Sequence, residues 1–146
     1  MSRTVTVKVS RRYAFPPERV FDAWLDPALA GRFLFATPEG QMLKVEIDAR
    51  VGGRFLIVER RGERDDAHEG QYLEIDRPRR LVFTFGDDIA FDATTVTVEI
   101  SPTQDGCELV LTHTGVGPEW EADTKAGWTG ILEGLRNYQP AHVSPT

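Results

Sequence analysis

The chain has 146 residues, of which 40% are hydrophobic and 27% charged, and its formal net charge is −6. This length predicts a single domain that buries enough surface to fold without a disulfide or a structural metal. An acidic chain argues against nucleic acid or an anionic membrane as a partner, because binding phosphates requires a basic surface.

The amino-terminal part predicts one strand followed by two short helices. Apolar and polar residues alternate over 5–15, which is the pattern of a half-buried strand. Two prolines end this strand, since proline cannot donate to a sheet ladder and suits the first turn of a helix. Apolar residues at helical spacing between 20 and 25 indicate a short helix. After the break at Asp26 and Pro27, a second short helix is expected over 28–34.

The middle of the chain predicts a series of strands joined by short turns, hence an antiparallel meander. The segment 55–58 is apolar on both faces, so either a helix or a partner subunit should cover its second face. A charged loop is expected over 62–68. The strands are predicted at 43–48, 55–58, 71–75, 81–85, 95–100 and 107–114.

A helix-length segment follows from Glu119 to Tyr138, with apolar residues three or four positions apart. It contains Gly127, Gly130 and Gly134, which together would cost a helix about 3 kcal/mol relative to alanine. Two explanations stay open: a close approach of the helix to the sheet, or space left for a ligand. The domain is expected to span 1–139, with a tail over 140–146.

Several segments form a recognisable pattern in their order along the chain. They are PERVFDAWLDP at 17–27, Asp48 with Val51-Gly52-Gly53, Gly70–Ile75, Arg80–Phe85, Leu111–His113 and Gly127-Trp128. In this order they resemble bacterial proteins similar to the activator of heat-shock-protein-90 ATPase. This family is a branch of the SRPBCC superfamily, which is also called START-like or birch-pollen-allergen-like. The resemblance covers roughly residues 9 to 138.

The resemblance implies an α+β helix-grip fold. In that fold a curved antiparallel sheet wraps around a long C-terminal helix, two short helices follow the first strand, and a cavity lies between sheet and helix. The superfamily includes lipid and steroid carriers, hormone receptors, and polyketide cyclases or hydrolases, and it shares no single catalytic set, so fold alone does not give function.

The chain departs from the family pattern in two respects. Many relatives carry a tryptophan where this chain has Gly31-Arg32-Phe33, which points to a different ligand preference. The eukaryotic co-chaperones carry a separate N-terminal domain that this chain lacks, so a chaperone partner is not expected.

His113 is the most informative polar residue. It lies an even number of residues after apolar positions earlier in its strand. Because side chains alternate between the two faces of a strand, the side chain of His113 should point inward with them. There it could orient a ligand or act as a general base, or it could be satisfied by a neighbouring group. Glu74 would also point inward if Tyr72 does, and it could form an acid–base pair with His113. The alternative is an ion pair with Arg54 or Arg80, and one bulge would reverse its direction.

The leading hypothesis is a non-enzymatic protein that binds a small apolar or lipid-like molecule between the sheet and the C-terminal helix. The alternatives are an enzyme of the cyclase or hydrolase type that uses His113 or Glu74, and a co-chaperone-like interaction module. A homodimer through the second face of 55–58 is a further expectation. The predicted ligand-binding residues are Trp24, Phe33, Phe55, Tyr72, Phe83, Phe85, Leu111, His113, Trp128, Ile131 and Leu135.

Neither a metal nor a cofactor is expected. The lone Cys107 has the parity of a small buried hydrophobe, and the acidic run at 65–69 lacks the spacing of a zinc or calcium site. The start of the chain lacks the apolar run of a secretory signal, and no stretch reaches the ~20 apolar residues of a membrane span, so a cytoplasmic protein is expected.

Overall fold

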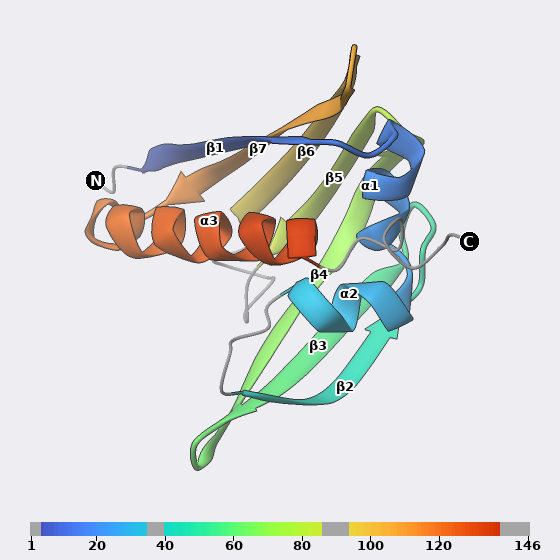
Figure 1. Ribbon diagram of the computed structural model, residues 1–146. Coiled ribbons are helices and arrows are strands. Elements are labelled where there is room, and N and C mark those ends of the chain that lie inside the picture. The colour runs from blue at the N-terminus through green and yellow to red at the C-terminus, as the bar shows by residue number, and fades with distance from the viewer. Residues whose placement is uncertain (1–3, 35–39, 86–93, 138–146) are drawn as a thin grey trace.

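The computed structural model describes residues 4–34, 40–85 and 94–137. Within them, seven antiparallel strands form one open sheet in the order β1-β7-β6-β5-β4-β3-β2 (Figure 1). The strands are β1 (Val5–Tyr13), β2 (Gln41–Ile47), β3 (Arg54–Arg61), β4 (Arg64–Asp76), β5 (Arg80–Phe85), β6 (Thr94–Thr103) and β7 (Gly106–Val116). The helices are α1 (Pro17–Ala23), α2 (Pro27–Phe33), the 3-10 turn η1 (Pro118–Trp120) and α3 (Glu121–Asn137). The predicted α+β architecture and antiparallel sheet are confirmed.

The two predicted short helices are present, although α2 begins one residue earlier than expected, at Pro27. Pro17 occupies the first turn of α1, where its missing N–H costs nothing. Asp26 caps α2, because its Oδ1 accepts a 3.0 Å hydrogen bond from the N–H of Ala28. The guanidinium of Arg77 binds both carboxylate oxygens of Asp22 at 2.7 and 2.8 Å. This bidentate pair fixes α1 to the turn between β4 and β5.

The sheet curves, and the helices lie on its concave face (Figure 1). Polar contacts of Tyr13 and Arg11 help to hold α3 against β1. The Tyr13 hydroxyl donates a 2.8 Å hydrogen bond to the carbonyl of Leu132, and Arg11 forms a 2.6 Å ion pair with Glu133. Among the described helices, none is long and apolar enough to cross a membrane.

The core lies between the concave face and the helices. On β7 the side chains of Cys107, Leu109 and Leu111 are fully buried, and they alternate with less buried neighbours. This is the period-two pattern of a strand with one buried face. Burial raises the pKa of the Cys107 thiol to about 11, so Cys107 packs as a neutral, hydrophobic side chain.

The segment at 62–68 corrects one prediction. Instead of a charged loop, residues from Arg64 onward form the start of β4, which pairs with β3 from Arg61↔Arg64 to Arg54↔Gln71. Only a tight turn separates the two strands, and Gly62 adopts the positive φ of +67° in it. The charges are compatible with a strand because opposite charges pair, as in the 2.9 Å contact between Arg60 and Asp65.

The second face of β3 is covered by no described helix, since the helices lie on the concave side. Phe55 and Ile57 are buried on that concave side, whereas Leu56 and Val58 on the outer side are half-buried. The prediction that a helix covers this face is therefore wrong, whereas the prediction that a partner subunit covers it stays a prediction.

The glycines of α3 fit neither of the explanations offered for them. Gly127 and Gly130 are exposed, and a Cβ built on either would meet nothing within 4 Å. A Cβ on Gly134 would lie 3.5 Å from the Cβ of Phe33, an ordinary packing distance to α2. The helix itself begins at Glu121, after η1, and the expected end at Tyr138 and the tail over 140–146 lie outside the described residues.

Candidate functional site

An aromatic cluster occupies the concave face between the sheet and the helices. Neighbouring ring centroids lie 5.4–6.4 Å apart, within the range of favourable aromatic contacts. Its rings come from the end of α1, from α2, from four strands and from α3, so residues far apart in sequence meet at one place. The cluster consists of Trp24, Phe33, Phe55, His68, Tyr72, Phe83, Phe85, His113 and Trp128.

Trp24 joins the helical side of this cluster to the sheet. Its ring is 5.5 Å from Phe33 on α2, 6.4 Å from Phe83 on β5 and 6.4 Å from Trp128 on α3. The Trp24 side chain is 1% exposed, and its indole Nε1 has no hydrogen-bond acceptor among the described residues. Buried donors of this kind are usually hydrogen-bonded, so the indole N–H of Trp24 is an exception.

His113 belongs to a hydrogen-bonded chain. Its Nδ1 accepts a 2.9 Å bond from the indole N–H of Trp128, which can only donate. Its Nε2 contacts the hydroxyl of Thr94, and this hydroxyl donates a 2.9 Å bond to the carbonyl of Phe85. These hydrogen-bond directions are consistent only if Nε2 of His113 carries the proton and donates a hydrogen bond to the hydroxyl oxygen of Thr94. The chain therefore fixes the neutral Nε2–H tautomer and connects α3 to β5, β6 and β7.

This environment determines the acid–base chemistry of His113. The side chain is 4% exposed, and burial lowers its pKa from 6.5 to about 4. The imidazole is therefore neutral at pH 7, and each ring nitrogen already has a partner inside the protein. A general base needs a free nitrogen in reach of its substrate, so His113 is better suited to holding Trp128 in place.

Glu74 lies away from the cluster. The pairing of β4 with β5 steps from Tyr72↔Phe83 to Glu74↔Val82, so a β-bulge at Leu73 reverses the side-chain parity. Tyr72 is buried, while the Glu74 side chain is 46% exposed and accepts a 3.1 Å hydrogen bond from Arg80. His113 and Glu74 therefore lie on opposite faces of the sheet, and the structure does not bring them together.

The remaining predicted wall residues pack in the same core. Leu111 on β7 and Leu135 on α3 are buried, and Ile131 is partly buried against them. Of the predicted site residues, the concave side thus collects the aromatic and aliphatic ones together with His113, whereas Glu74 lies outside.

One buried charged residue was not predicted from the sequence. Glu59 on β3 is 1% exposed, and its carboxylate forms a 2.6 Å ion pair with Arg61. Arg61 also contacts Asp66, which in turn binds Arg64 at 2.8 Å. Glu59 shares parity with Phe55 and Ile57, so extending the strand pattern by one residue beyond Val58 would have placed it on the concave face.

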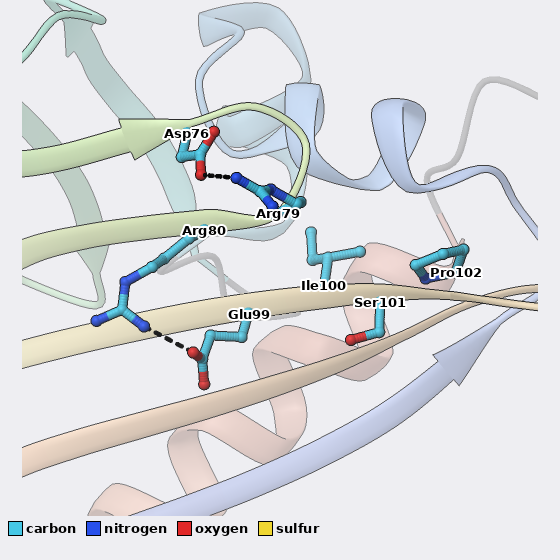
Figure 2. A pocket seen from close by; sticks show the side chains of 7 residues that line it. All are labelled: Asp76, Arg79, Arg80, Glu99, Ile100, Ser101 and Pro102. Atoms are coloured by element: carbon cyan, nitrogen blue, oxygen red, sulfur yellow. Dashed lines mark hydrogen bonds and ion pairs between the residues drawn. The ribbon is translucent and has the colours of Figure 1, made fainter.

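A hollow lies on the outer side of the sheet, at the turn between β4 and β5 (Figure 2). It has a volume of about 420 Å³. Its charges cancel locally, because Arg79 pairs with Asp76 and Arg80 with Glu99, each at 2.6 Å. Paired arginines leave little positive charge for a phosphate group. The residues around the hollow are Asp76, Arg79, Arg80, Glu99, Ile100, Ser101 and Pro102.

The described residues hold no group of three or more histidine, cysteine or acidic side chains placed to bind a metal ion. The acidic segment at 65–69 lies on β4, where Asp65, Asp66 and Glu69 each form an ion pair with an arginine.

An open antiparallel sheet that curves around a C-terminal helix, with two short helices after its first strand, defines a helix-grip-like protein. The sequence model of the family described as "Activator of Hsp90 ATPase homolog 1-like protein" matches residues 14–139, so the chain belongs to this family. The resemblance noted from the sequence motifs is confirmed. No curated protein matches the chain significantly.

Solved structures with the same fold come from several bacteria. A protein from Chromobacterium violaceum is 28% identical, with a TM-score of 0.78 over 92% of this chain and 96% of that one. An AHSA1-like protein from Aeromonas hydrophila is 24% identical, with a TM-score of 0.82 over 95% and 94%. A Staphylococcus aureus protein of unknown function has a TM-score of 0.88 at 16% identity, over 97% of each chain. The last two likenesses establish the fold alone.

Proposed function

We propose that this protein binds a small, largely apolar molecule without transforming it, at the aromatic cluster between the concave face and helices α2 and α3. The observation that carries the proposal is the cluster itself, in which rings from separate elements converge on one buried region. Flat aromatic walls with few polar groups suit an apolar ligand, because burial of its surface supplies most of the binding energy.

The state of His113 supports binding over catalysis. A cyclase or hydrolase reaction at this site would need an acid or base with a free polar atom, and both His113 nitrogens are occupied. The other candidate, Glu74, is paired with Arg80 on the outer face. In the proposed role, His113 fixes the orientation of Trp128 and thereby shapes one wall of the site.

The route of entry in this proposal involves α2. Neighbouring rings of the cluster are in contact, so a ligand enters by displacing a side chain rather than by filling a rigid hollow. Phe33 is the most suitable one to move, because it ends a helix of seven residues, and a helix this short depends on packing for its stability. Movement of α2 would open the space beside Trp24 and leave the sheet unchanged.

The test is a titration with N-phenyl-1-naphthylamine, a neutral aromatic probe whose fluorescence rises in an apolar site. We expect saturable binding of one probe per chain. Phe85→Ala should weaken it about fivefold or more, since truncation removes a ring from the site. The matched control is Trp120→Ala, because Trp120 is 58% exposed and belongs to η1, outside the cluster.

Two results would contradict the proposal. One is a fluorescence signal that never saturates, which would mean non-specific adsorption. The other is equal weakening by Phe85→Ala and Trp120→Ala, which would place the probe elsewhere on the protein.

A further inference from the structure

Trp24 carries a polar group that the described part of the chain leaves unused. Its indole N–H lies in a side chain that is 1% exposed, and no acceptor among the described residues is within hydrogen-bond distance. Removing a donor from water without giving it a partner is unfavourable, and buried indole N–H groups usually have one. The position of this donor, among the rings of Phe33, Phe83 and Trp128, is the position of the proposed ligand.

Three other polar groups that face the helices are already used inside the protein. The Trp128 N–H donates to His113, the Tyr13 hydroxyl donates to the carbonyl of Leu132, and His113 itself donates to Thr94. None of these donors can donate to a ligand without losing an existing bond. Trp24 differs from them, because a ligand acceptor would add a hydrogen bond and displace none.

We propose that the ligand is an apolar molecule carrying one uncharged oxygen acceptor, of the ketone or ether type, and that this oxygen accepts the Trp24 N–H. This inference rests on the proposed function and specifies the ligand class for the same site. An indole N–H donates and never accepts, so it selects an acceptor.

The acceptor is uncharged because the described surroundings of Trp24 are. Among the described residues, the three rings that contact Trp24 carry no formal charge, and an ionised carboxylate buried there would need a cation beside it. The basic side chains of the concave face at the β3–β4 turn, Arg61 and Arg64, already pair with carboxylates. A charged ligand group would therefore lose its hydration without compensation.

The test uses two probes of nearly the same shape, 2-acetylnaphthalene and 2-isopropenylnaphthalene. They differ in one group, because the C=O of the ketone is replaced by C=CH₂, which accepts no comparable hydrogen bond. Affinities are measured by displacement of N-phenyl-1-naphthylamine from the unchanged protein, from Trp24→Phe and from the exposed-site control Trp120→Phe. Dividing the affinity for the ketone by that for the alkene cancels the shared apolar contribution.

We expect this affinity ratio to fall about fivefold in Trp24→Phe and to stay unchanged in Trp120→Phe, as for the loss of one neutral hydrogen bond. If both probes bind and the ratio is the same in all three proteins, the inference about Trp24 is overturned while the proposed binding function stands. If neither probe binds any of the proteins, the proposed function fails, and this inference fails with it.

A second measurement decides the matter if Trp24→Phe does not fold. In the unchanged protein, the three indole N–H signals are resolved by ¹H–¹⁵N NMR and assigned with Trp120→Phe and Trp128→Phe. The Trp24 proton should move downfield when the ketone is added and much less with the alkene, because only the ketone accepts its hydrogen bond. An identical shift with both probes would refute the proposal.

Discussion

Acidification should destabilise this protein through His113. Its pKa is about 4 in the folded state against 6.5 for an exposed histidine. Between pH 6.5 and pH 4 the histidine binds a proton in the unfolded chain but not in the folded chain. The free energy of unfolding therefore falls as the pH falls. The contribution is complete above about pH 6.5 and is lost on the way down to about pH 4. With 1.36 kcal/mol per pKa unit, the loss is about 3 kcal/mol.

The structural cause is that two hydrogen-bond donors would face each other. Protonation would place a hydrogen on Nδ1 of His113, which faces the N–H of Trp128 at 2.9 Å. Two donors would then oppose each other at a buried position, and α3 would lose its bond to β7. The pKa of Asp22 is lowered by its hydrogen bonds with Arg77, so this carboxylate does not account for a loss of stability in the range where His113 acts.

The assay is urea denaturation between pH 7 and pH 4.5, with His113→Asn as the reference. The asparagine side chain offers an oxygen near the position of Nδ1 but takes up no proton. Subtracting the two pH profiles removes the contribution of every other group, so the difference isolates His113. The unchanged protein should lose about 2–3 kcal/mol more than His113→Asn over this range. Parallel profiles would refute the reasoning.

Four further substitutions test the packing. Gly127→Ala and Gly130→Ala should each stabilise the protein by about 1 kcal/mol in urea denaturation, because both positions are helical with open space around the added methyl group; destabilisation would show that the space is occupied. Tyr13→Phe should cost about 1 kcal/mol, since the hydroxyl loses its buried bond to α3; an unchanged midpoint would argue against that bond. Gly70→Ala should reduce the melting temperature strongly, because its Cβ would overlap the carbonyl oxygen of Thr84, and a wild-type melting curve would contradict the β4–β5 packing.

Most of the fold was predictable because alternation and turn residues reflect local physics. Valines alternating with polar residues at 5–9 place one face of β1 inward, and Pro17 and Pro27 start the two short helices. The start of β4 escaped prediction, because a run of charges at 64–66 is typical of a loop. Only the pairing of these charges within the β3–β4 hairpin makes the strand favourable.

The candidate site was predictable in part. Parity placed His113 inward, and it is buried as that argument requires. The same argument failed for Glu74, because a bulge at Leu73 shifts the register and is invisible in the residue pattern. The partners of His113 come from β6 and α3, so only the folded chain could reveal that both of its nitrogens are occupied.

The central claim is that an apolar molecule binds among the rings of the concave face. A crystal structure of the protein grown with N-phenyl-1-naphthylamine tests it most directly. We predict that the probe lies between Trp24, Phe83 and Trp128, with α2 displaced and the sheet unchanged. A probe bound in the outer hollow beside Arg79 and Glu99, with the aromatic cluster closed, would contradict the claim.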